Sequence, residues 1–97
     1  MKDKIAGIQT IDNKTMIRIK ISISSQRNYT RFRKALLDKF NLKIRGDGGF
    51  TYLMGKGIDM NIFKGDKYFH IVLYATPKKR KEILPILFNY FEFMASS

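Results

Sequence analysis

The segment from Thr15 to Ile23 alternates strictly between apolar and polar residues, and this pattern constrains the fold more than any other feature of the chain. Isoleucine occupies every second position from 17 to 23, and the residues between are Arg18, Lys20 and Ser22. Successive side chains of a strand point to opposite faces of a sheet. The pattern therefore predicts a strand with one buried face and one face that carries cations.

Further strands and a first helix are predicted from similar patterns. Residues 5–11 are expected to pair with the isoleucine strand as a hairpin through a turn at 12–14. Ser24 or Ser25 is expected to cap a helix that runs to about Phe40. Its apolar residues recur at three- and four-residue steps and form one stripe: Tyr29, Phe32, Leu36 and Phe40. Strands are then predicted at 42–45, 50–54, 58–63 and 68–75, with turns at 46–49, 55–57 and 64–67.

A second helix is expected to begin at Thr76-Pro77, because the hydroxyl can cap it and proline suits its first position. It is expected to reach about Met94, with a kink or a restart at Pro85. The element order ββαβββ(β)α predicts an α+β fold, in which both helices pack on one face of a mostly antiparallel sheet of about five strands. Residues 1–97 show no linker or repeat and are expected to form a single domain.

The charge of the chain is strongly unbalanced. Lys and Arg total 19 against eight Asp and Glu, which gives a formal net charge of +11. From residue 18 to residue 45, Asp38 is the one acid among nine cations. Because a field of one sign destabilises a compact state, it indicates a polyanionic partner. We therefore expect a small basic protein that binds nucleic acid, either RNA or DNA.

Composition argues against several other kinds of site. The chain has no cysteine and a single histidine, His70, so a disulfide or a metal site is not expected. The turn at 46–49 is glycine-rich but lacks the spacing of a P-loop. We expect no cofactor, no metal and no catalytic residue. The N-terminus lacks the apolar run of a signal peptide, and residues 83–94 are too short to span a bilayer, so we expect an intracellular, cytoplasmic protein without membrane association.

The face of the sheet away from the helices is expected to combine cations with aromatic rings. If the isoleucines and Ile44 face the helices, the opposite face carries Arg18, Lys20, Lys43 and Arg45. In the strand at 68–75, the same alternation places Tyr68, His70 and Tyr74 on that face. Cations contact phosphates, and aromatic rings stack on bases with about 1–3 kcal/mol each. We therefore predict that Tyr68 and Tyr74 are stacking residues.

Two further groups of cations are candidates for phosphate contact. One stands at the start of the second helix: Lys78, Lys79, Arg80 and Lys81. Cations there oppose the helix dipole, unless an anionic partner reverses the sign of the effect. The same run is also typical of a nuclear localisation signal, or of a solvated run of charges. The other group shares one side of the first helix: Arg27, Arg31 and Lys34.

Two families resemble parts of the chain. From Ser25 to Met94 the order helix, three strands, helix is similar to the double-stranded RNA-binding domain, which also has lysines where Lys78, Lys79 and Lys81 stand here. The chain lacks the histidine that this family carries in the loop between its first two strands, and the family has no counterpart of the N-terminal hairpin. The same stretch resembles small RelE-type toxins, which are ribosome-dependent RNases. That resemblance implies contacts to the transition state from Arg80, Lys81 and Tyr90, although the paired N-terminal helices of the toxins are absent.

Three alternatives to a non-catalytic nucleic-acid-binding protein stay open. The first is a small toxin-like RNase that acts through positioned cations, with Arg80 or His70 essential for cleavage. The second is a protein inhibitor or adaptor that docks on an acidic partner surface. The third is a homodimer formed through exposed aromatic residues such as Phe63, Tyr90 and Phe93.

Overall fold

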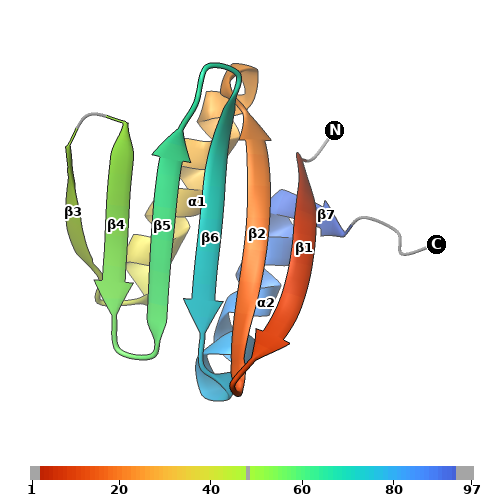
Figure 1. Cartoon of the computed structure of the whole chain (residues 1–97), viewed down its shortest axis with the longest axis vertical. Coiled ribbons are helices and arrows are strands. Elements are labelled where there is room, and N and C mark those ends of the chain that lie inside the picture. The colour runs from red at the N-terminus through yellow and green to blue at the C-terminus, as the bar shows by residue number, and fades with distance from the viewer. Residues whose placement is uncertain (1–2, 48, 94–97) are drawn as a thin grey trace.

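One sheet, in the strand order β3-β4-β5-β6-β2-β1-β7, forms the body of the protein in a computed structural model (Figure 1). The structure describes residues 3–47 and 49–93, with side chains described for 7–46 and 49–91. The strands are β1 Asp3–Ile11, β2 Lys14–Ser22, β3 Lys43–Asp47, β4 Phe50–Gly55, β5 Ile58–Lys64, β6 Tyr68–Ala75 and β7 Phe91–Phe93. The first six pair antiparallel, and the short β7 runs parallel to β1 at the sheet edge.

Two helices, α1 Gln26–Lys39 and α2 Pro77–Tyr90, lie on the same side of the sheet. Figure 1 views the sheet from its other side, so both helices stand behind the strands. The predicted α+β fold is confirmed. The strand count is higher than expected, because four strands lie between the helices and β7 was not predicted.

The β1–β2 hairpin turns through two residues with positive φ, Asp12 at 49° and Asn13 at 64°. A two-residue turn of type I′ requires positive φ at both central positions, and Asp and Asn tolerate this backbone conformation better than other non-glycine residues. The predicted hairpin is therefore confirmed, and its tight turn sets which residues of β1 and β2 face each other.

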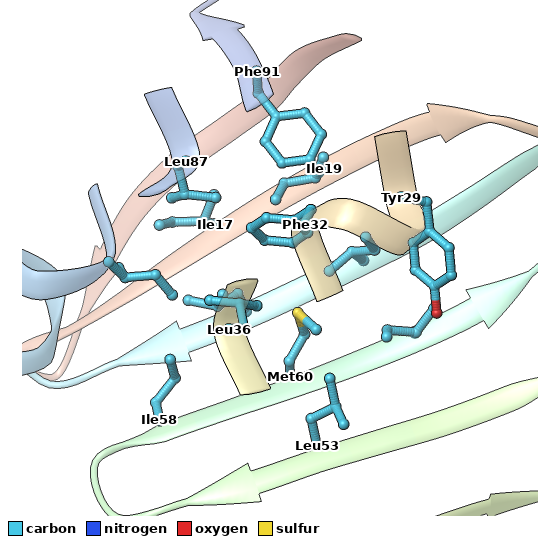
Figure 2. Close-up of a cluster of buried hydrophobic side chains, with 14 of the residues drawn as sticks. Ile17, Ile19, Tyr29, Phe32, Leu36, Leu53, Ile58, Met60, Leu87 and Phe91 are labelled. Carbon is cyan, nitrogen blue, oxygen red and sulfur yellow. The ribbon is translucent and has the colours of Figure 1, made fainter. Parts of the chain in front are cut away.

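The hydrophobic core lies between the sheet and the helices. Ile17, Ile19 and Ile21 of β2 are buried, and they face the predicted apolar stripe of α1. Figure 2 shows Phe32 of α1 in the middle of this cluster, with side chains of β2 beside it. The Phe91 ring meets the Phe32 ring edge-on, with their centroids 4.8 Å apart. The core therefore joins the sheet, both helices and the start of β7.

The two helices begin differently. The Thr76 hydroxyl accepts a hydrogen bond from the Lys79 amide at 3.4 Å and Pro77 follows it, as predicted for α2. For α1 the prediction holds for the position of the cap but not for its hydrogen bond. Ser25 occupies the capping position without a side-chain bond, whereas the Ser22 hydroxyl accepts from the Ser24 amide at 3.3 Å and caps a short 3₁₀ turn, Ile23–Ser25.

The predicted end of α2 is also wrong. The helix stops at Tyr90, because Phe91 adopts an extended backbone and begins β7 beside β1; Met94 lies outside the described residues. The helix is continuous through Pro85, so the expected restart does not occur. Pro85 is exposed, and its ring therefore meets water rather than the core.

The glycine turns agree only in part with the prediction. The predicted turn at 46–49 begins later, because Gly46 and Asp47 still pair with β4. A Cβ on Gly46 would collide with the Phe50 carbonyl, so only glycine allows this close approach of β3 and β4. Between β4 and β5, Gly57 has a φ of +78°, which favours glycine in this tight turn.

Phe32→Ala should lower the free energy of unfolding by about 3–5 kcal/mol, because it empties a fully buried ring site. The matched control is Phe63→Ala, which removes a ring that is 50% exposed on the other side of the sheet and should change it by less than about 1 kcal/mol. Urea unfolding followed by circular dichroism measures both. Equal losses would contradict this placement of the core.

Candidate nucleic-acid interface

The sheet surface away from α1 and α2, here called the open face, is covered by no described element (Figure 1). From β3 to β2, the strand register sorts most of its described side chains into three rows that cross the strands. The upper row contains Phe50, Phe63, His70 and Lys20. The middle row contains Arg45, Tyr52, Asn61, Val72 and Arg18. The lower row contains Lys43, Met54, Asp59, Tyr74 and Met16.

Four of the predicted phosphate-binding residues lie in these rows and are exposed: Arg18, Lys20, Lys43 and Arg45. None of them forms an ion pair with a residue whose side chain the structure describes. Asp59 is the one acid among the described side chains of the three rows. The open face is therefore positively charged, and its cations are available to an anionic ligand.

A continuous series of rings crosses three strands of the open face, and we call it the aromatic ridge. In order along the ridge the residues are Tyr52, Phe50, Phe63, His70 and Tyr68. Consecutive ring centroids lie 4.5, 6.3, 6.4 and 6.2 Å apart. Phe63 is 50% exposed and Tyr52 42% exposed. These rings therefore form one connected aromatic strip at the surface of the sheet.

Only His70 and Tyr68 of the ridge were placed on this face from the sequence. Phe50, Tyr52 and Phe63 were missed as ligand contacts. For Phe63 the signal is present, because the apolar residues at 58, 60 and 62 of β5 are buried and leave position 63 on the opposite face. In β4 only Leu53 is fully buried, and the apolar residues on both sides of it hide the alternation.

The two predicted stacking tyrosines are less accessible than Tyr52 and Phe63, two of the rings that were missed. The Lys20 ammonium lies 4.1 Å from the centroid of the Tyr68 ring and covers one face of it. Tyr74 is half-buried in the lower row, between Asp59 of β5 and Met16 of β2. Phe63 and Tyr52 are therefore the better surfaces for a flat ligand.

A hollow of about 330 Å³ lies at the β3–β4 end of the ridge. Its lining consists of Arg45, Gly46, Phe50 and Tyr52. Arg45 lies directly opposite Tyr52 in the strand register. The hollow thus joins a guanidinium group to two aromatic rings.

The predicted lysine cluster lies beyond the lower row, at the end of the sheet where α2 begins. A hollow of about 520 Å³ there is lined by Lys56, Gly57, Thr76, Lys78 and Lys79. A neighbouring hollow, which includes Tyr74 and Asp59 of the open face, shares Gly57 and Thr76 with it. The cluster therefore borders the open face, and Lys56 of the β4–β5 turn, which was not predicted to bind, lies beside it.

The four cations of the cluster are not equivalent. The Lys79 ammonium lies 3.4 Å from a carboxylate oxygen of Glu82 and 5.4 Å from the centroid of the Phe40 ring. Lys79 and Arg80 are half-buried, whereas Lys78 and Lys81 are exposed. Lys78 and Lys81 are therefore the members most accessible to a ligand.

The predicted cations of α1 lie on the other side of the molecule. Arg27, Arg31 and Lys34 are exposed on a helix that covers the opposite face of the sheet from the ridge (Figure 1). A ligand that lies flat on the open face does not reach them. The structure thus divides the predicted binding residues into an open-face group, a helix-end group that borders it, and a separate α1 group.

Two residues named for other roles lie elsewhere than expected. Tyr90 is half-buried, its ring lies 6.0 Å from the Phe32 ring, and its carbonyl accepts a hydrogen bond from the Asn28 side chain at 3.2 Å. This packing ties Tyr90 to the helix layer rather than to an exposed contact surface. The side chain of Phe93 lies outside the described residues, whereas Phe63 is exposed on the ridge.

No family model matches this chain, and searches of curated proteins and of solved structures found no similar protein. Within residues 3–47 and 49–93, no three His, Asp or Glu residues gather where they could hold a metal ion. In the same residues, no helix is long and apolar enough to cross a membrane.

Lys78→Glu should raise the free energy of unfolding by at least about 0.3–1 kcal/mol at low salt, because it replaces a cation in the first turn of α2 by an anion that favours the helix dipole. Lys67→Glu is the matched control, since it makes the same change of net charge at an exposed position in the β5–β6 turn. Urea unfolding at low and high salt measures both. Equal shifts in the two variants would show that general charge repulsion, rather than the helix dipole, is responsible.

Proposed function

We propose that this protein binds nucleic acid through the open face of its sheet and has no catalytic role. The observation that carries the proposal is the combination of four exposed cations and a connected aromatic ridge on the same uncovered surface. Cations of this kind contact phosphates, while aromatic rings contact bases. A purely structural sheet face has no need for either group in this arrangement.

The charge supports the proposal through its distribution. Arg18 and Arg45 stand at opposite ends of the middle row, Lys20 ends the upper row and Lys43 ends the lower row. The cations therefore stand at both ends of the rows rather than gather at one point. Since each phosphate that a cation neutralises releases counterions, such an arrangement yields affinity that falls steeply as salt rises.

The lysine cluster at the start of α2 extends this surface around the end of the sheet. Lys56 and Lys78 line its hollow at the N-terminal end of α2, where the helix dipole favours an anion. We assign it phosphate contacts that add to those of the open face. We assign the α1 cations no contact with the same ligand, because the sheet separates them from the ridge.

His70 is assigned a binding role rather than a catalytic one. Its ring is exposed and lies between the rings of Phe63 and Tyr68, at 6.4 and 6.2 Å between centroids. A ring in this position contributes surface to the ridge.

Replacing Arg18, Lys43 and Arg45 together by Gln should weaken binding to nucleic acid and reduce its dependence on salt. If each cation neutralises one phosphate, the slope of log affinity against log salt should fall in magnitude by about 2 to 3. Fluorescence anisotropy across a salt series measures this slope, with single- and double-stranded DNA and RNA of matched length as ligands.

The matched control replaces Arg27, Arg31 and Lys34 by Gln, which removes the same charge from α1. This variant should keep most of the original slope. An equal fall in both triple variants would contradict the assignment of the open face. A native protein without binding near physiological salt would contradict the proposed function and would favour a partner protein with an acidic surface.

A further inference from the structure

We infer that the ligand of the open face is a single-stranded polynucleotide whose unpaired bases stack on the aromatic ridge. This inference rests on the proposed function and specifies its ligand. It also assigns binding roles to Phe50, Tyr52 and Phe63, none of which was predicted from the sequence to contact a ligand.

The first argument is the accessibility of the ring faces. Each base inside a duplex is covered on both faces by its neighbours, so a duplex offers the ridge only phosphates and groove edges. Unpaired bases expose their faces and stack readily on aromatic side chains. The exposed rings of Phe63 and Tyr52 therefore find a complementary partner in a single strand and none inside a duplex.

The second argument is the hollow at one end of the ridge. Its volume of about 330 Å³ lies near the lower end of the range for small-molecule sites, about 300–1,000 Å³. Guanidinium planes and aromatic rings are both surfaces on which unpaired bases stack. Arg45, Phe50 and Tyr52 thus line an open hollow in which one base can stack.

The third argument is that each end of the ridge carries a cation. Arg45 lies opposite Tyr52 at the β3 end, and Lys20 lies over the Tyr68 ring at the β2 end. A strand whose bases lie along the ridge has its phosphates beside them, and these cations flank that path. Because Lys20 covers Tyr68, the stacking surface is formed by the other four rings of the ridge.

A second copy of the chain suits this face less well. Face-to-face contact of two copies would bring Arg18, Lys20, Lys43 and Arg45 close to the same cations of the partner, with Asp59 as the one described acid in the three rows. Contact between surfaces of like charge is disfavoured. Charge complementarity therefore selects a polyanion with exposed apolar faces, which describes unpaired nucleic acid.

The decisive variant is Phe63→Ala, with Phe88→Ala as its matched control. Phe88 is 42% exposed on α2, on the side of the sheet away from the ridge. The ligands are a single strand of polyuridine, one of polythymidine, a duplex, and an abasic strand, all of matched length. Fluorescence anisotropy near physiological salt measures the affinity of each protein for each ligand.

We expect the unmodified protein to bind both single strands at least about tenfold more tightly than the duplex. Phe63→Ala should weaken single-strand binding by about 5- to 100-fold and leave duplex and abasic binding unchanged. Phe63→Tyr should retain single-strand affinity, and Phe88→Ala should bind as the unmodified protein does.

Three outcomes would overturn the inference, and they differ in whether the proposed function survives. Equal affinity for single strand and duplex, with Phe63→Ala no weaker than Phe88→Ala, would refute stacking but leave the proposed function intact. Absence of binding to any of these ligands by the folded, unmodified protein would refute both. A defect of Phe63→Ala that extends equally to the abasic strand would also refute stacking, since that strand has phosphates but no bases.

Discussion

The burial of the β2 isoleucines against α1 is the contact on which the rest of the structure depends. Ile17, Ile19 and Ile21 are at most 2% exposed, and because side chains alternate along a strand, their burial forces Arg18 and Lys20 to the opposite face. β2 pairs with β6 on one side and β1 on the other. The face to which each β2 side chain points therefore determines, through the strand register, which side chains of the other strands share that face. A slip of one residue would turn the cations into the core, which makes this register strongly favoured.

The same constraint explains how a chain with a net charge of +11 folds. The core contains apolar side chains from the sheet and both helices, while the cations stay at the surface, where water and salt screen their repulsion. Some unfavourable electrostatic interactions of the cations remain in the folded protein. Lys78 stands in the first turn of α2, where the helix dipole disfavours a cation, and the three rows of the open face carry four cations against one described acid. Stability alone does not explain these placements, whereas the nucleic-acid ligand that we propose does.

The fold was predictable where a sequence pattern allowed only one interpretation. The alternation of β2 and the stripe of α1 each contrast apolar with polar residues, and both were confirmed. β4 offers no such contrast, because Phe50, Tyr52 and Met54 on its open side are as apolar as Leu53 on its buried side. The ridge was therefore largely hidden in the sequence. The end of α2 was missed for a different reason, since β7 depends on parallel pairing with β1 at the far end of the chain, which no local pattern reveals.

The open face separates the two kinds of contact that we propose for its ligand. Four of the five ridge rings lie in the upper and middle rows, whereas the lower row leads through Gly57 and Thr76 to Lys56 and Lys78. Phosphate contacts weaken as salt rises because released counterions gain less entropy, but stacking of bases on rings does not depend on counterions. The lysine cluster therefore contributes most to the binding free energy at low salt, and stacking on the ridge contributes a larger share of it as salt increases. On this argument, discrimination between single strand and duplex should sharpen with salt even as total affinity falls.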